Sequence, residues 1–120
     1  MTNPKTQDAQ FYEHVATIAR NISEGMTIET DSDAYDEDCP DALLSGWDYL
    51  SDALDIQYVT DSAKQFAGVR VLVAFGGPNI WVDMHRGEVV GSWWGATASA
   101  QIWDDPMGIE DAAAELFNCI

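Results

Sequence analysis

Basic side chains are scarce in this sequence. Only five Lys and Arg accompany 21 Asp and Glu, so the formal net charge is −16. Contacts to nucleic-acid phosphates need clustered Lys and Arg, and so does attraction to an anionic lipid surface. The composition therefore argues strongly against direct nucleic-acid binding and excludes binding to an anionic membrane.

Long apolar runs, cysteines and histidines are also few. The longest apolar runs, such as 71–75, are far shorter than the roughly 18 residues of a membrane span. The N-terminus, Met-Thr-Asn-Pro-Lys, lacks the apolar stretch of a signal peptide. Cys39 and Cys119 lie far apart and fit no paired metal spacing. We expect a protein with reduced thiols in the cytoplasm of a host cell.

Candidate catalytic and metal-binding residues do not form a recognisable site. His14 and His85 fit surface or half-buried positions better than catalytic ones. The acidic segment from Asp31 resembles a calcium-binding EF-hand loop only superficially, because such a loop needs Gly at its sixth position and Glu at its twelfth. Those positions here are Asp36 and Ala42. We expect no enzymatic activity, no metal and no cofactor.

The apolar residues that are present suffice for one small core. The chain has 120 residues, 47% of them hydrophobic, with five Trp, four Tyr and four Phe. This length falls within the usual range of a single domain. We therefore expect one acidic domain over 1–120, with 1–8 as a flexible lead-in.

Three segments carry apolar residues at helical spacing. They predict helices over 10–22, 40–54 and 109–117. Gly25 is suited to end the first helix, and Pro40 is suited to the first turn of the second. In the second helix the apolar positions are Leu43, Trp47, Leu50 and Leu54.

Four further segments predict strands, over 55–60, 69–75, 80–84 and 89–94, with turns at 76–79 and 85–88. If residue 75 faces 80 and residue 84 faces 89, one sheet face is wholly apolar and should carry the helices. That face holds Val69, Val71, Val73, Phe75, Ile80, Val82, Met84, Val89 and Trp93. The predicted fold is α+β, an antiparallel sheet of three or four strands with helices packed on one face.

The opposite sheet face is expected to be mixed, with Arg70, Leu72, Ala74, Trp81, Asp83, Val90, Ser92 and Trp94. Arg70 and Asp83 could form a cross-strand ion pair. Exposed tryptophans are unusual unless something covers them. Either the segment 96–106 folds back over Trp81 and Trp94, or the two residues contact the target protein or another copy of the chain in a homodimer.

The acidic residues are concentrated in one stretch. Between Arg20 and Lys64 lie 43 residues with 12 acids and no Lys or Arg. On a helix over about 40–54, four acids would fall within about 60° of one another, namely Asp41, Asp48, Asp52 and Asp55. Together with the loop carboxylates they would give a linear charge density comparable to that of nucleic-acid phosphates. The candidate contact residues are Glu29, Asp31, Asp33, Asp36, Glu37, Asp38, Asp41, Asp48, Asp52 and Asp55.

Three interpretations of this acidic stretch remain open. It is a solvated surface, an imitation of nucleic-acid phosphates that binds a basic partner, or an adaptation to high salt. Salt adaptation normally spreads acids over the whole surface, whereas the segment 64–103 carries only Asp83 and Glu88 as acids.

In size, in its charge of −16 and in the acidic run over 29–61, the chain resembles small acidic inhibitors encoded by phages and other mobile elements. These include antirestriction proteins and DNA-mimicking anti-CRISPR proteins, which share no common fold. The resemblance implies stoichiometric inhibition of a bacterial nucleic-acid-binding defence complex, whose basic groove the carboxylates would occupy. The alternative is an immunity protein that neutralises a basic nuclease toxin.

Overall fold

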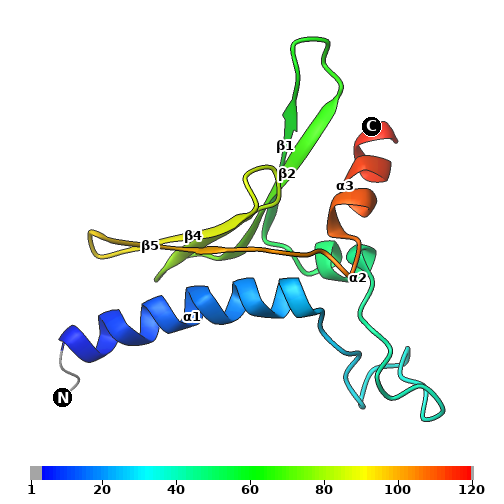
Figure 1. The fold of residues 1–120 in the computed structure, drawn as a ribbon, viewed down its shortest axis with the longest axis horizontal. Coiled ribbons are helices and arrows are strands. Elements are labelled where there is room, and N and C mark those ends of the chain that lie inside the picture. The colour runs from blue at the N-terminus through cyan, green and yellow to red at the C-terminus, as the bar shows by residue number, and fades with distance from the viewer. Residues whose placement is uncertain (1–3, 120) are drawn as a thin grey trace.

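The protein is an open five-stranded antiparallel sheet with three helices (Figure 1). A computed structural model describes the backbone of residues 4–119 and the side chains of residues 8–119. The strands follow one another across the sheet in chain order, so every neighbouring pair is an antiparallel hairpin. The elements are α1 (Pro4–Glu24), α2 (Gly46–Ser51), β1 (Asp55–Thr60), β2 (Phe66–Ala74), β3 (Asn79–Asp83), β4 (Glu88–Trp93), β5 (Ala96–Gln101) and α3 (Ile109–Asn118). The predicted α+β class is confirmed, with one strand more than expected.

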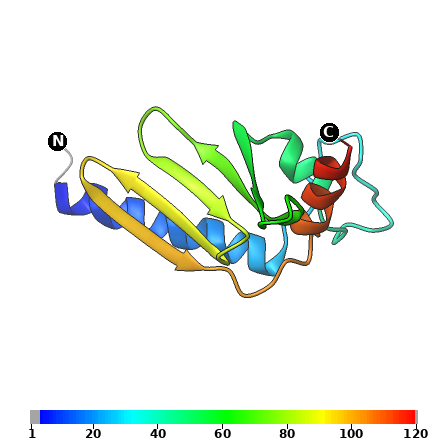
Figure 2. The same cartoon turned by 90° about the horizontal axis from the view of Figure 1, so that it is seen from above.

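The helices lie on one face of the sheet (Figure 2). α1 packs against β4 and β5, while α2 and α3 pack on each other and α3 contacts β2. Gly91 of β4 makes the approach of α1 possible, because a Cβ there would lie 2.9 Å from Cγ2 of Val15 and 3.0 Å from the Phe11 ring. The core between helices and sheet is formed by buried residues that include Phe11, Val15, Ile22, Val71, Ile80, Val82, Val89 and Ile109.

The expected sheet faces hold for most positions, although the register differs. Val82 pairs with Val71 and with Val89, which is a shift of two residues from the expected pairing at both turns. Because side chains alternate with period two, a shift of two leaves each residue on its predicted face. The predicted apolar face therefore carries the helices.

Phe75 and Ala74 are exceptions, because β2 contains a bulge. The register of β2 against β3 shifts between Leu72 and Ala74, and Ala74 then packs against the core together with Val73. A bulge places one extra residue on a strand and so exchanges the faces beyond it. The prediction that Phe75 lies in the core is wrong, because its side chain is 74% exposed and lies on the other face.

The first helix is longer than expected. α1 begins at Pro4, a residue favoured at the first position of a helix, and ends at Glu24 before Gly25, whose φ is +88°. Residues 4–8 are therefore helical, where a flexible lead-in was expected. Residues 1–3 lie outside the described residues.

The helix predicted over 40–54 is wrong for most of its length. The backbone of 42–44 pairs instead with 26–28, through Ile28 N–H to Ala42 O at 3.1 Å and Leu44 N–H to Met26 O at 2.7 Å. The Ser45 hydroxyl then caps α2, accepting a hydrogen bond from Asp48 N–H at 3.1 Å. α2 consequently has only six residues.

The strand β5 is absent from the prediction. Trp94 and Gly95 were expected to end the sheet, but their φ angles of +51° and +79° form a two-residue turn, and the chain returns along β4 as β5. Ala, Thr, Ser and Gln occupy this strand. Three of its six residues are Ala, which has a weak strand preference, so the sequence carries little signal for it.

Candidate functional site

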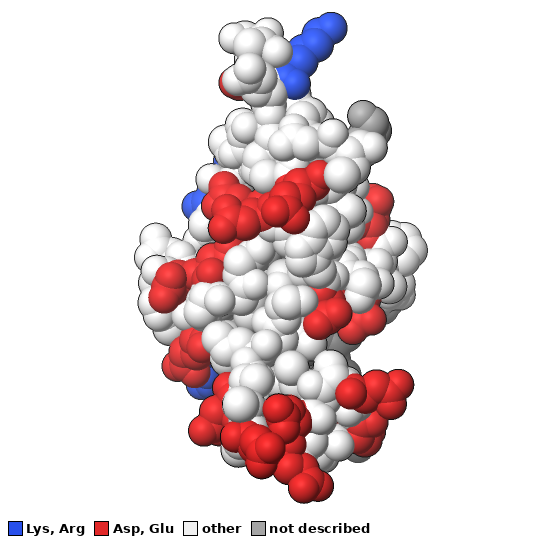
Figure 3. All heavy atoms as spheres, turned by 90° about the vertical axis from the view of Figure 1, so that its right-hand side faces the viewer, with Lys and Arg blue, Asp and Glu red and all other residues white. Residues whose placement is uncertain are grey.

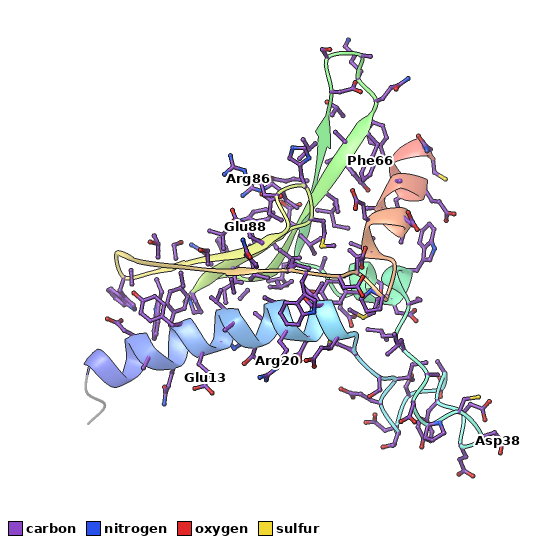
Figure 4. The ribbon with its side chains drawn as sticks, in the orientation of Figure 1. Glu13, Arg20, Asp38, Phe66, Arg86 and Glu88 are labelled. Atoms are coloured by element: carbon purple, nitrogen blue, oxygen red, sulfur yellow. The ribbon has the colours of Figure 1, made fainter. Side chains whose placement is uncertain are left out.

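The most acidic part of the surface is the loop between α1 and α2, here called the acidic loop (residues 29–41). It extends away from the sheet and helices, with Asp38 near its tip (Figures 1 and 4). Asp36 stabilises one turn of the loop, where its Oδ1 accepts a hydrogen bond from Asp38 N–H at 2.9 Å. Its carboxylate residues are all exposed, namely Glu29, Asp31, Asp33, Asp36, Glu37, Asp38 and Asp41.

The remaining predicted acids lie on different elements. Asp48 belongs to α2, Asp52 is its C-cap residue, and Asp55 begins β1. Asp41 precedes α2 and lies in the acidic loop. The predicted row of four carboxylates on one helix face is therefore wrong, because the segment 40–54 does not form one helix.

Carboxylate groups are scattered over this side of the molecule. When the acidic-loop end faces the viewer, Asp and Glu form separate patches, with a dense group at the lower end (Figure 3). Within the described part of the chain, the one ion pair joins Arg70 and Asp83, on the sheet and outside the acidic loop. The charge of the acidic loop is thus not neutralised by the residues that the structure describes.

The face of the sheet opposite the helices is open to solvent. A hollow of about 440 Å³ lies on this face, near the turns that join β2 to β3 and β4 to β5. The predicted ion pair is confirmed here, with Arg70 Nε 3.5 Å from Asp83 Oδ2. Residues lining the hollow are Asp55, Leu72, Phe75, Asn79, Trp81, Val90, Gly91, Ser92 and Thr97.

Trp81 lies on this open face, where the sheet register predicted it. The residue is half-buried, and Arg70 lies over its ring. The cover expected from 96–106 is wrong, because 96–101 extends the sheet beside β4 as β5. Of the predicted acids, only Asp55 shares the hollow with Trp81. The sequence reasoning missed Phe75 at this site, since the β2 bulge that exposes it has no evident sequence signal.

Trp94 is not on the sheet face where it was predicted. It occupies the turn between β4 and β5 and is 89% exposed, the most exposed of the large hydrophobic residues that the structure describes. The preceding Trp93 points to the helix face, where its ring meets the Phe11 ring at a centroid distance of 6.0 Å. The structure therefore separates the predicted site into the acidic loop, the open sheet face and the Trp94 turn.

The described residues contain neither a metal-binding cluster nor a membrane-spanning helix. No group of three or more His, Cys, Asp and Glu in residues 8–119 is arranged to hold a metal ion. None of the helices described is long and apolar enough to cross a membrane.

The features that define this chain are an α+β fold, an uncompensated acidic loop and exposed aromatic side chains. Comparison with protein-family models, curated proteins and solved structures found no match to the chain.

Proposed function

We propose that this protein is a stoichiometric inhibitor of a nucleic-acid-binding protein or complex. The acidic loop would bind the basic groove that normally receives nucleic-acid phosphates. A bacterial defence complex is the target class suggested by the resemblance to anti-CRISPR and antirestriction proteins.

The observation that carries this proposal is the uncompensated exposure of the acidic loop. Seven carboxylate side chains lie within residues 29–41, and all seven are exposed. Repulsion among like charges opposes folding and does not stabilise the isolated chain. A cationic surface on a partner would supply the missing compensation, and the charge would also accelerate the encounter.

The mode of binding differs from a copy of the phosphate backbone. The acidic loop is built from tight turns, including Cys39 N–H to Asp36 O at 3.0 Å, and has no helical repeat. We therefore propose competition by charge density and position rather than by phosphate-like spacing. Such competition depends on salt, because exposed charges are screened over about 8–10 Å at moderate ionic strength.

The test begins with capture of partners from a bacterial lysate on the immobilised protein, followed by elution with salt or with double-stranded DNA. The proposal predicts that DNA releases a nucleic-acid-binding protein. The purified protein should then lose its DNA binding in proportion to added inhibitor. Capture of proteins that DNA cannot displace would contradict the proposal.

A pair of variants distinguishes inhibition that depends on the acidic loop from inhibition that depends only on total net charge. The loop variant carries D31N, D33N, D36N, E37Q and D38N, and the amide introduced at position 36 retains an acceptor for the Asp38 N–H bond. The control variant carries D8N, E13Q, E24Q, D111N and E115Q, all at exposed positions on helices. Inhibition should be lost in the loop variant and retained in the control. Equal loss in both would show that only total charge matters.

A further inference from the structure

Trp94 has a conformation and an exposure that the isolated fold does not explain. Its φ of +51° lies in the left-handed region, which is unfavourable for a bulky side chain, and 89% of the residue is exposed. Asn or Gly is the usual residue at this position of a two-residue hairpin turn. The structure thus holds a large apolar side chain at the tip of the β4–β5 hairpin at an energetic cost.

A hollow able to receive such a side chain lies at the same end of the molecule. It has a volume of about 290 Å³ and is lined by Gln10, Phe11, His14, Pro78 and Trp93. Trp93 connects the two features, because it lines the hollow and directly precedes Trp94. No carboxylate of the described residues lines this hollow.

The distribution of charge favours contact at this end. The acidic loop lies beyond the C-terminal end of α1, whereas the Trp94 turn lies above the N-terminal half of that helix (Figure 1). Neither of the adjoining turns, 75–79 and 93–96, contains an acid. Glu13 projects from the side of α1 that faces away from the sheet (Figure 4). Asp8, which is exposed one helical turn before Phe11, is an acid of α1 that adjoins this end. Contact here would still keep the acidic loops of two chains of charge −16 apart.

We infer that the occupant of this hollow is Trp94 of a second copy of the chain, in a symmetric homodimer. A two-fold interface requires one self-complementary patch, in which a protruding residue and its receiving site lie side by side. The Trp94 tip and the Phe11–Trp93 hollow satisfy that requirement. The two acidic loops then point to opposite ends of the dimer.

The available area implies a weak dimer. Large aromatic side chains bury roughly 150–250 Å² each, so two exchanged tryptophans supply about 300–500 Å². A stable interface buries about 1,600 Å² summed over both partners. Tyr12, whose ring lies 5.8 Å from that of Phe11, extends the apolar area next to the hollow. We expect a dissociation constant in the micromolar range, which corresponds to a binding free energy of about 8 kcal/mol.

The test is sedimentation velocity of the full chain over a concentration series. Wild-type protein should shift from monomer to dimer, and more readily with added salt, because salt screens the repulsion between copies. W94N should weaken association by more than about tenfold. It should fold at least as stably as wild type, since Asn suits the left-handed turn position. Trp103 provides the matched control, because it is 65% exposed and its backbone N–H donates to Ser23 Oγ near the C-terminal end of α1. W103N should dimerise normally.

A second variant tests the receiving hollow separately. H14E places a carboxylate on an exposed helical position that lines it, so folding should be preserved while dimerisation weakens. Wild-type protein that stays monomeric up to about 0.1 mM at moderate salt would overturn the inference. Equal effects of W94N and W103N would also overturn it. If W94N weakens only the binding of a basic partner protein, the inference is overturned and Trp94 belongs to that interface instead.

Discussion

The guanidinium of Arg70 lies over the ring of Trp81, with Cζ 4.9 Å from the ring centroid, and its Nε is 3.5 Å from Oδ2 of Asp83. The sheet register places these groups together, because Arg70 pairs with Asp83 and Leu72 with Trp81. One of only five basic side chains is thereby engaged within the sheet. It is therefore not available to pair with the carboxylates of the acidic loop.

The Asp83 carboxylate should stabilise the open sheet face. Asp83 is only 7% exposed, and its Oδ1 accepts a hydrogen bond from Arg86 N–H at 3.0 Å. D83N keeps the acceptor but removes the charge beside Arg70, so we expect a loss of about 1–2 kcal/mol in unfolding free energy. Asp55 on the same face has no ion-pair partner among the described residues, and D55N should change stability by less than about 0.5 kcal/mol. Urea melts compare the two, and equal effects would contradict this role of Asp83.

The adjacent tryptophans should differ in their contribution to stability. Trp93 packs edge-on against Phe11 at an interplanar angle of 64°, so W93A should cost about 2–4 kcal/mol through lost packing. W94A removes an exposed side chain and should cost less than about 1 kcal/mol. The measurement is denaturant unfolding at low protein concentration, where dimers do not contribute. A larger loss in W94A would show that Trp94 is structural.

Tyr49 should make stability sensitive to alkaline pH. Burial raises the pKa of its phenol from 10.0 to about 12, because desolvation disfavours the charged phenolate. The folded state therefore binds the proton more tightly than the unfolded state, and unfolding free energy should fall as pH rises from 10 to about 12. Two pKa units correspond to roughly 2–3 kcal/mol. Y49F should remove this part of the pH dependence, and an unchanged dependence in Y49F would refute the assignment.

Neutralising the acidic loop should not harm the fold. Its carboxylates are exposed and make no ion pair with any described residue, so the variant with five substitutions in the loop should melt at the same temperature as wild type or slightly higher. Added salt should raise the melting temperature of wild type more than that of the variant, since less repulsion remains to be screened. A large drop in melting temperature at low salt would mean that the carboxylates hold the loop together.

Local sequence patterns predicted the middle of the sheet well. The β-branched runs around Val71 and Val82, separated by glycine-containing turns, led to β2, β3 and β4 and to their buried face. The acidic loop was also evident, because a charge run needs no fold to be recognised. A helix was wrongly predicted over 40–54 because part of its backbone pairs with another part of the chain. Leu43 has helical spacing to Leu50, but its backbone pairs with Thr27 instead.

The candidate site was predicted less completely than the fold. The row of Asp41, Asp48, Asp52 and Asp55 required a continuous helix, and the cap at Ser45 and the pairing of 42–44 prevent it. Trp94 was assigned to a strand because the sequence Trp-Trp-Gly did not reveal a turn with Trp in the left-handed region. Such a turn goes against the local preference, which is itself a reason to associate Trp94 with binding.

Whether the acidic loop binds a basic partner is tested by measuring the affinity for the DNA-displaceable partner as a function of salt. Titration calorimetry would compare wild type, the loop variant and the helical control variant between about 50 and 200 mM salt. Wild type and the control variant should bind with similar affinity, and this affinity should fall at least about tenfold as salt rises. The loop variant should bind weakly, with an affinity that is nearly independent of salt. An affinity of wild type that does not change with salt, or an affinity that is unchanged by the five substitutions, would show that the acidic loop is not the binding surface.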